Sequence, residues 1–202
     1  MTDQVWWYTA RAGGIVAWAL MAAGVLWGLA LSTKVLRGKP RPNWVLDLHR
    51  FLGGLAVVFT GVHVTAIVAD SYVHFGLTEI LVPFTGDWHP VAVAWGIIGA
   101  YFLAAVEITS LLRRRLSKRA WRSTHYLSFP LFVLTTVHAL SAGTDRHSFV
   151  LRWGVIATCV AVTALTFVRV RRVERPPTAR PAPPIDWSPP RVLVGTGAKE
   201  SS

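Results

Sequence analysis

The pattern of apolar and polar positions divides most of the chain into long hydrophobic segments separated by short polar connections. An α-helix needs about 20 consecutive, mostly apolar residues to cross the ~30 Å hydrocarbon core of a bilayer. Five segments approach or reach this length, near residues 13–33, 51–69, 90–112, 126–142 and 150–168. The pattern therefore predicts an all-α integral membrane bundle of five transmembrane helices.

Composition supports a membrane protein and limits its chemistry. Of the 202 residues 52% are hydrophobic and only 15% are charged, compared with about 25% charged in soluble domains. The first apolar segment is longer than the core of a secretion signal, and its positive charges follow it, so we expect it to remain as a helix. The single cysteine, Cys159, excludes an intramolecular disulfide and a cysteine-held cluster.

The basic residues predict the orientation of the bundle. All but three of the 21 Lys and Arg residues lie in the ranges 34–50, 113–122 and 169–199, and the exceptions are Arg11, Arg146 and Arg152. By the positive-inside rule the N-terminus is outside and the C-terminus is cytoplasmic. Since topology explains the net charge of +11, we expect a lipid bilayer, in a bacterial plasma membrane, and no nucleic acid as partner.

The domain organisation is simple. Residues 1–174 are predicted to form one transmembrane domain, and residues 175–202 a Pro-rich, flexible cytoplasmic tail without hydrophobic periodicity. The tail is far shorter than a nucleotide or flavin domain of about 100 residues, and no GxGxxG or Walker pattern occurs. We therefore expect any flavin or quinone to act only through a partner or a surface site.

Two of the predicted helices each carry two histidines at nearly the same separation, one just before the apolar segment and one within it. His49 and His63 are fourteen residues apart, and His125 and His138 are thirteen apart. One reversing helix separates the two segments, so they run in the same direction. This predicts that His49 lies level with His125 near the cytoplasmic face and His63 level with His138 towards the outside, with ~20 Å between the levels.

The thirteen-residue step is the weaker of the two. In an ideal helix it leaves His125 and His138 about 140° apart around the axis, whereas the fourteen-residue step leaves its pair within about 40°. Pro130 lies between His125 and His138, and proline removes a backbone hydrogen bond and can change the winding of a helix. A structure is needed to decide whether both pairs form.

Facing imidazole pairs in an apolar bundle favour haem, because imidazole is a strong iron ligand and the macrocycle sits well between helices. Zinc would require four ligands at one point. Gly53, Gly54 and Gly61 are predicted to let a flat ring approach α-helical backbone, or only to ease helix packing. A histidine-lined metal transporter and simple packing of the histidines are the alternatives.

The double pair, His49 and His63 with His125 and His138, resembles the ferric-reductase-like transmembrane domain of yeast-type ferric reductases and NADPH oxidases. It is also similar to the haem-binding membrane subunit of the bacterial periplasmic methionine sulfoxide reductase system. The resemblance covers roughly residues 13–170. It implies two b-type haems, or one, with these four histidines as axial iron ligands, and electron transfer across the membrane as a subunit of an oxidoreductase.

The resemblance also indicates what kinds of electron donor and acceptor to expect. The expected donor is cytoplasmic or a quinol, and the expected outer acceptor is ferric iron, oxygen or a partner redox protein that docks on residues 71–89. The chain shows five helices where the family has six, and it lacks the flavin and nicotinamide domain of the eukaryotic members. A non-catalytic haem-binding anchor or sensor subunit is the alternative function.

For the remaining polar residues, our first interpretation is a structural or surface role. His74, His89 and His147 are expected on the outer connections, with contact to an acceptor or metal as alternative. Glu107 is expected to pair with Arg113–Arg115 or to reach the interface, with a quinone or proton role as alternative. We expect a short interfacial helix in "LTEILVPF", a helix that starts at Pro90, and a helix cap from Ser123 or Thr124. We also expect the carboxylates of the haem to meet Arg50, Lys118 or Arg122.

Overall fold

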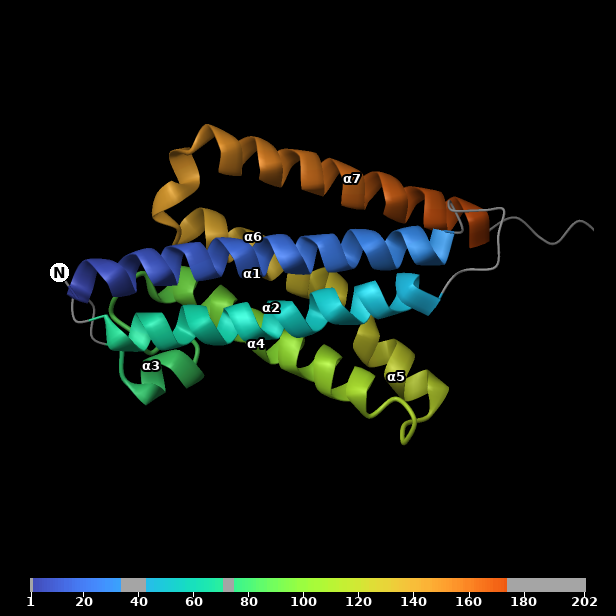
Figure 1. Ribbon diagram of the computed structural model, residues 1–202, viewed down its shortest axis with the longest axis horizontal. Coiled ribbons are helices and arrows are strands. Elements are labelled where there is room, and N and C mark those ends of the chain that lie inside the picture. Colours follow the sequence, from blue (N-terminus) through green and yellow to red (C-terminus); the bar gives the residue numbers. More distant parts are fainter. Residues whose placement is uncertain (1, 34–42, 71–74, 174–202) are drawn as a thin grey trace, which may run out of the picture.

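The computed structural model describes residues 2–33, 43–70 and 75–173, and these ranges contain helices and no strand (Figure 1). The elements in chain order are α1 (Thr2–Thr33), α2 (Asn43–Ala69), α3 (Leu77–Leu81), α4 (Pro90–Leu111), α5 (Lys118–His125), α6 (Ser128–Ser141), the 3₁₀ turn η1 (Thr144–His147) and α7 (Phe149–Val173). The predicted tail, His74 and the basic residues of 34–42 lie outside the described residues.

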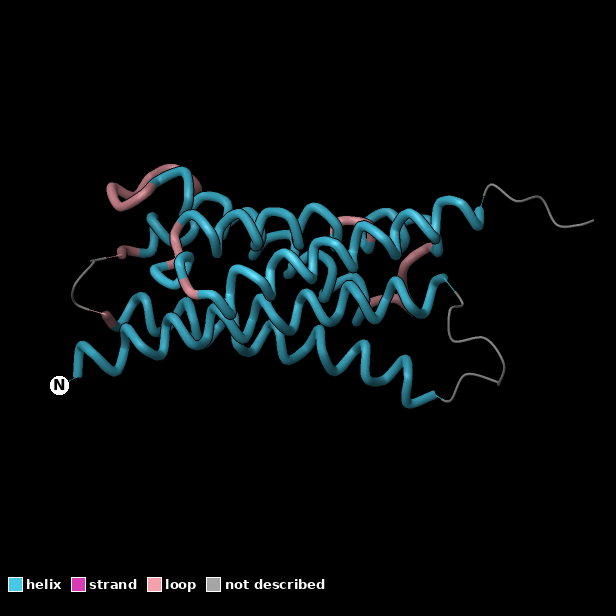
Figure 2. The backbone as a smooth tube through the Cα atoms, turned by 90° about the horizontal axis from the view of Figure 1, so that it is seen from above, coloured by secondary structure: helices cyan, strands magenta, loops and turns pink. Residues whose placement is uncertain are grey.

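Four helices, α1, α2, α4 and α7, are long and apolar enough to cross a membrane. They contain four of the five predicted segments and run side by side along the length of the bundle (Figure 2). The predicted segment 126–142 instead forms α6, which has 14 residues and therefore spans about 21 Å. The all-α class is confirmed, and four membrane-spanning candidates are present among the described residues.

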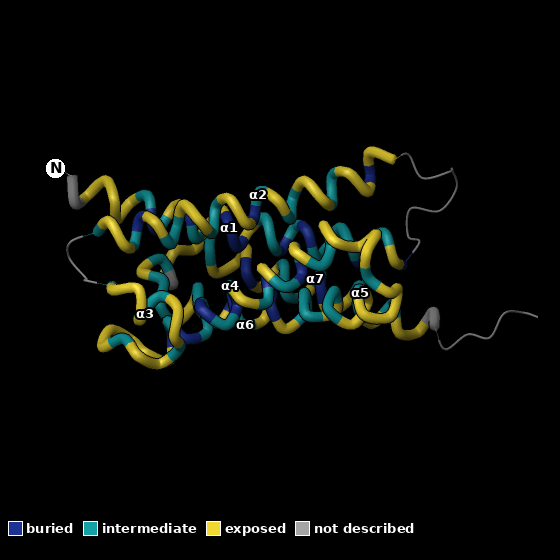
Figure 3. Tube along the Cα trace, turned by 90° about the horizontal axis from the view of Figure 1, so that it is seen from below, coloured by how far each residue is buried: buried dark blue, intermediate teal, exposed yellow. Residues whose placement is uncertain are grey.

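The outer surface of the bundle is apolar. Of the spanning segments, between 11% and 33% of the residues are buried inside the protein, and Figure 3 shows exposed residues along the length of the long helices. Large side chains such as Phe51, Val58 and Val160 are more than half exposed. A surface of this kind is unfavourable in water and is the normal surface of a helix in lipid.

The interior is built around α1. This helix packs against α2, α6 and α7, and α4 packs against α5, α6 and α2. The core contains Trp18, Leu29, Phe132 and Val155, and the free thiol of Cys159 lies at its edge. Trp18 Nε1 donates a hydrogen bond to Thr136 Oγ1 at 3.0 Å, so the polar atom of the largest core side chain is satisfied.

A break between α5 and α6 determines how the backbone winds between His125 and His138. Leu127 N–H donates to the Thr124 carbonyl at 3.0 Å, and Phe129 N–H donates to the Tyr126 carbonyl at 3.2 Å. These are tight three-residue turns, and they form where Pro130 cannot supply the N–H that an unbroken helix needs. The expectation of one continuous helix was wrong: His125 ends α5, and His138 belongs to α6.

The ends of the elements follow partly from the sequence. α4 begins at Pro90 as predicted, after His89 with a left-handed φ of 43°, and α3 forms within the stretch "LTEILVPF". Tyr101 donates its hydroxyl hydrogen to the carbonyl of Leu81, which joins α3 to α4. The predicted cap was wrong, because Ser117 accepts from Ala120 N–H and starts α5 before Ser123 and Thr124.

Candidate functional site

The structure forms the two histidine pairs that the sequence predicts. The ring centroids of His49 and His125 are 5.9 Å apart with planes at 74°. Those of His63 and His138 are 6.3 Å apart with planes at 76°. We call the first the α5-end pair and the second the α3-end pair, after the short helix at the same end of the bundle (Figure 1).

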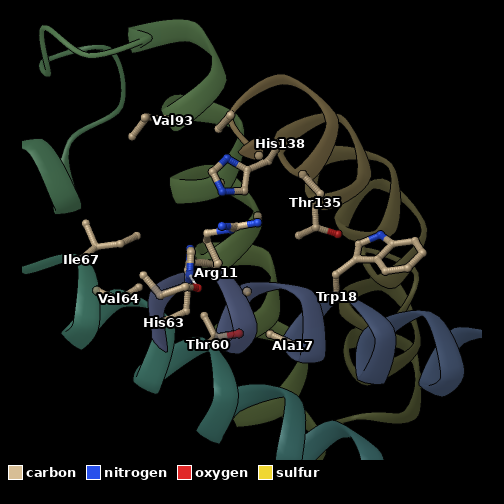
Figure 4. A pocket seen from close by; sticks show the side chains of 18 of the residues that line it. Arg11, Ala17, Trp18, Thr60, His63, Val64, Ile67, Val93, Thr135 and His138 are labelled. Carbon is tan, nitrogen blue, oxygen red and sulfur yellow. Dashed lines mark hydrogen bonds between the residues drawn. The ribbon is translucent and has the colours of Figure 1, made fainter. Parts of the chain in front are cut away.

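The α3-end pair lies in a cavity. His63 from α2 and His138 from α6 both line a space of about 390 Å³, and Figure 4 shows the two rings with Arg11, which extends into the same space. This volume is within the usual range for ligand pockets. α2 and α6 are not among the helix pairs with extensive contacts, and the two histidines face each other across the cavity between them.

Backbone carbonyls orient both rings of the α3-end pair. His63 Nδ1 lies 2.6 Å from the carbonyl oxygen of Ala10, and His138 Nδ1 lies 2.8 Å from that of Ala92. A carbonyl only accepts, so each Nδ1 carries the hydrogen and donates it. The lone pair is then on Nε2 of each ring, which is the form of histidine that binds a metal.

Three glycines make room for the rings. A Cβ on Gly14 would lie 2.9 Å from His63 Nδ1, one on Gly96 would lie 2.7 Å from His138 Cε1, and one on Gly28 would lie 3.2 Å from His49 Cε1. Gly14 and Gly96 follow Ala10 and Ala92 by four residues, which is about one helical turn. Because Gly14 and Gly96 have no side chain, each leaves room for the imidazole ring next to the carbonyl that accepts its hydrogen bond.

The glycines predicted from the sequence are different ones. Gly53 lies against the carboxylate of Glu107, and a Cβ on Gly54 or Gly61 would meet nothing within 4 Å. Neither Gly54 nor Gly61 is therefore at a close helix contact. The prediction placed the glycines that make room for a ring on the helix that carries the histidine, whereas in the structure these glycines lie on the facing helices α1 and α4.

The α5-end pair is oriented differently. The Nδ1 atoms of His49 and His125 are buried and have no hydrogen-bond partner within the described residues, and the same holds for Nε1 of Trp121. The backbone of Gly24 is the polar group facing His49. Trp121 stacks on His125 with ring centroids 5.1 Å apart and planes at 23°. Packing against Trp121 holds the His125 ring, whereas the His49 ring faces the backbone of Gly24.

The distances fit two imidazoles on opposite sides of one metal ion. Such rings have centroids about 6 Å apart, because each metal–nitrogen bond is about 2.0 Å long and each nitrogen lies about 1 Å from its ring centroid. Both pairs match this separation. Within the described part of the chain no group of three or more His, Cys, Asp or Glu side chains is placed to hold a metal, so each pair offers two protein ligands.

A haem suits this donor set. Its four ring nitrogens fill the plane of the iron and leave two axial positions for histidine. Three observations bear on this fit: the cavity that His63 and His138 line, the tautomer fixed at these two rings, and the buried Nδ1 atoms at the α5 end that have no hydrogen-bond partner within the described residues. The residues present therefore fit haem, and they fit a closed four-ligand zinc site less well.

The other predicted polar residues lie away from the pairs or in different contacts. Arg50 pairs with Asp47 at 3.2 Å, and Lys118 and Arg122 are exposed on α5. His89 stacks edge-on with Trp88, and His147 is exposed in η1.

The interpretation of Glu107 changes. No ion pair to Arg113–Arg115 forms, since Arg113 instead lies over the Trp121 ring, 4.5 Å from its centroid. α4 ends at Leu111, so Arg113–Arg115 lie in the turn that follows the helix of Glu107. Glu107 is half-buried, with its carboxylate beside Gly53 of α2.

An ion pair closes the α3 end of the bundle. Arg11 of α1 makes a two-bond contact with Asp145 of η1, in which Arg11 Nε lies 2.9 Å from Asp145 Oδ2. The guanidinium also lies over the ring of Trp7, 4.1 Å from its centroid. Arg11 is the one cation among the described residues that line the cavity of His63 and His138.

The fold is a bundle of apolar helices with two pairs of facing histidines in its interior. Residues 13–136 match the family of the ferric reductase like transmembrane component, and the chain belongs to this family. The match includes His49, His63 and His125, and His138 lies two residues beyond it. Family membership assigns the chain to membrane redox components.

The other comparisons add little about function. An uncharacterised protein of Archaeoglobus fulgidus is 27% identical to this chain over 155 residues, which cover 70% of this chain and 81% of that protein. No solved structure matches the chain significantly.

Sequence reasoning missed four residues of the site, namely Gly14, Gly28, Gly96 and Trp121. A signal for the first two was present, because Gly14 and Gly28 are fourteen residues apart, as are His49 and His63. Antiparallel neighbouring helices bring equal steps into register. Trp121 precedes His125 by four residues, which places two rings on one helix face.

Proposed function

We propose that this chain is a b-type cytochrome that carries electrons between the two faces of a membrane and acts as the haem-binding subunit of an oxidoreductase. The observation that supports this most directly is the pair of facing imidazoles at each of two levels, with centroids 5.9 Å and 6.3 Å apart. His49 with His125, and His63 with His138, are the proposed axial ligands.

The chain's own groups prepare the ligands. Ala10 and Ala92 accept the Nδ1 hydrogens of His63 and His138, and such bonds fix the tautomer and raise the basicity of the ligating nitrogen. Apolar side chains of α1, α4 and α6 line the cavity and exclude water. His49 with His125, and His63 with His138, would hold haem, which would supply one-electron transfer there.

The proposed topology has five crossings with the N-terminus outside. α6, extended by α5, completes the fifth crossing, and the basic residues place the α5 end in the cytoplasm by the positive-inside rule. The α3-end pair then lies near the outer face, where the acceptor is ferric iron or a partner redox protein. The α5-end pair faces a cytoplasmic donor or quinol, and the membrane is a bacterial plasma membrane.

The first experiment measures haem per chain. The protein is purified in mild detergent, and oxidised and dithionite-reduced visible spectra are combined with a pyridine haemochrome assay. We expect two b-type haems, a signal roughly halved in His63→Ala, and an unchanged signal in the control His147→Ala, whose histidine is exposed in η1. Absence of haem, under conditions in which a control cytochrome is loaded, refutes the proposal.

A second experiment tests transfer across the membrane. The protein is reconstituted in liposomes with a reductant inside and ferricyanide outside. We expect ferricyanide reduction that depends on the protein and is lost in His49→Ala. A haem-loaded protein that passes no electrons in either orientation contradicts the electron-carrier function.

A further inference from the structure

The two pairs are held in place by different interactions. His63 and His138 are each fixed by a hydrogen bond from Nδ1 to a backbone carbonyl. His125 has a buried Nδ1 without a partner in the described residues. An imidazole that is not fixed by a hydrogen bond can rotate about its side-chain bonds unless packing prevents it.

The contact that restrains His125 is Trp121. The two rings are nearly parallel, at 23°, with centroids 5.1 Å apart, and the same His125 ring meets His49 at a steep angle of 74°. The indole therefore covers a face of the imidazole. Aromatic rings in this arrangement gain specific attraction in addition to the area that they bury.

Arg113 extends the stack. Its guanidinium carbon lies 4.5 Å from the centroid of the Trp121 ring, which is a cation–π distance. A second cation, Arg169, lies over the ring of the neighbouring Tyr126, 5.5 Å from its centroid, so both arginines are near His125. The contact with Trp121 thus places one positive charge close to the α5-end pair.

The local fold produces this stack. Trp121 and His125 are four residues apart on α5 and share one helix face. Ser117 caps the start of α5, and the break at Tyr126–Leu127 ends it. The helix ends directly after His125, and the tight turns at Tyr126–Leu127 connect it to α6.

We propose that Trp121 is a positioning residue that orients the His125 imidazole towards His49, and that Arg113, held against Trp121, sets the redox potential of the α5-end site. This inference rests on the proposed function, because it describes how one haem ligand is oriented. A fixed positive charge favours the reduced iron, so the Arg113 contact raises the potential of the site.

The test uses a His138→Ala background, in which the α5-end site is the one site with both of its histidines. Four variants are compared: Trp121→Leu removes the ring, Trp121→Phe keeps an aromatic ring, Arg113→Gln removes the stacked charge, and Arg114→Gln removes an equal charge from the next position. Haem content, the low-spin EPR signal and the midpoint potential are measured for each. The EPR signal reports the angle between the two imidazole planes.

We expect Trp121→Leu to change the EPR signal and Trp121→Phe to restore it. At a fixed ambient potential Arg113→Gln should lower the ratio of reduced to oxidised haem three- to tenfold, where tenfold corresponds to 59 mV for one electron. Arg114→Gln should change this ratio less than twofold. Because Arg113→Gln leaves the indole in place, it tests the inference even if Trp121→Leu is not recovered folded.

Two results overturn the inference while leaving the proposed function intact. One is a Trp121→Leu protein with the EPR signal and potential of its parent. The other is an Arg114→Gln shift as large as that of Arg113→Gln, which would assign the effect to the general field of the basic connection. Failure of the proposed function is separate and visible earlier, as the absence of haem from the unsubstituted protein.

Discussion

Substitution of Gly96 by alanine tests how closely α4 approaches the α3-end pair. The added Cβ would lie 2.7 Å from Cε1, 2.8 Å from Nδ1 and 3.0 Å from Nε2 of His138. All three distances are shorter than an ordinary carbon contact of about 3.5 Å. The ring must therefore retreat from α4, away from the Ala92 carbonyl to which it donates.

The expected size of the effect follows from this displacement. A retreat of about 0.8 Å, added to the 2.8 Å between Nδ1 and the Ala92 oxygen, takes that contact beyond hydrogen-bond length. Loss of the hydrogen bond leaves the buried Nδ1–H of His138 without an acceptor, at a cost of about 1–3 kcal/mol. Loss of such an orienting partner lowers metal affinity about 10–100-fold, which is about 1.4–2.7 kcal/mol and agrees with the first estimate.

The assay is haem retention at the α3-end site, measured in a His125→Ala background as haem per chain during titration with a haem-binding competitor. Gly54→Ala is the matched control, because a Cβ there meets nothing within 4 Å and alanine also favours the helix. We expect Gly96→Ala to lose haem at 10–100-fold lower competitor concentration than Gly54→Ala. Equal retention in the two variants would refute the argument that Gly96 makes room for the His138 ring.

Three other predictions concern stability. A double-mutant cycle on Arg11→Ala and Asp145→Ala should give a coupling of about 1 kcal/mol in thermal unfolding, since the pair is partly exposed; zero coupling would contradict a stabilising pair. Trp18→Phe should cost about 1 kcal/mol and Thr136→Val more, because the latter leaves the buried indole N–H unpaired; the reverse order of melting temperatures would contradict this. Tyr101→Phe should speed amide hydrogen exchange in α3 against an unchanged α7, and equal protection of α3 would show that the hydroxyl bond does not hold it.

The sequence predicts a helix well where a single physical rule determines its position. Long apolar runs identify α1, α2, α4 and α7, and Pro90 marks the start of α4 because proline is well suited to a first helical turn. The segment 126–142 is less predictable. Its apolar length suggests one helix, but the missing N–H of Pro130 divides the helix into α5 and α6. The position of such a break depends on neighbouring packing.

The histidine pairs are predictable because spacing along parallel helices determines depth. His49 and His125 share one level and His63 and His138 the other, as the two steps of fourteen and thirteen residues imply. Their orienting groups are not predictable in the same way. Every residue except proline has both a backbone donor and a carbonyl acceptor, so Ala10 and Ala92 carry no signal in the sequence.

The contacts of α1 constrain how this chain can gain or lose residues. Gly14 and Gly28 of α1 meet His63 and His49 of α2, so both sites depend on one shared register. A one-residue insertion between His49 and His63 would turn the second ring by about 100° and move it 1.5 Å, away from its glycine. Seven residues make nearly two full turns and eleven nearly three, so matched insertions of these lengths in α1 and α2 would preserve both contacts. Along these two helices, the separation of the two sites can therefore change only in discrete steps, the smallest of which is about 10 Å.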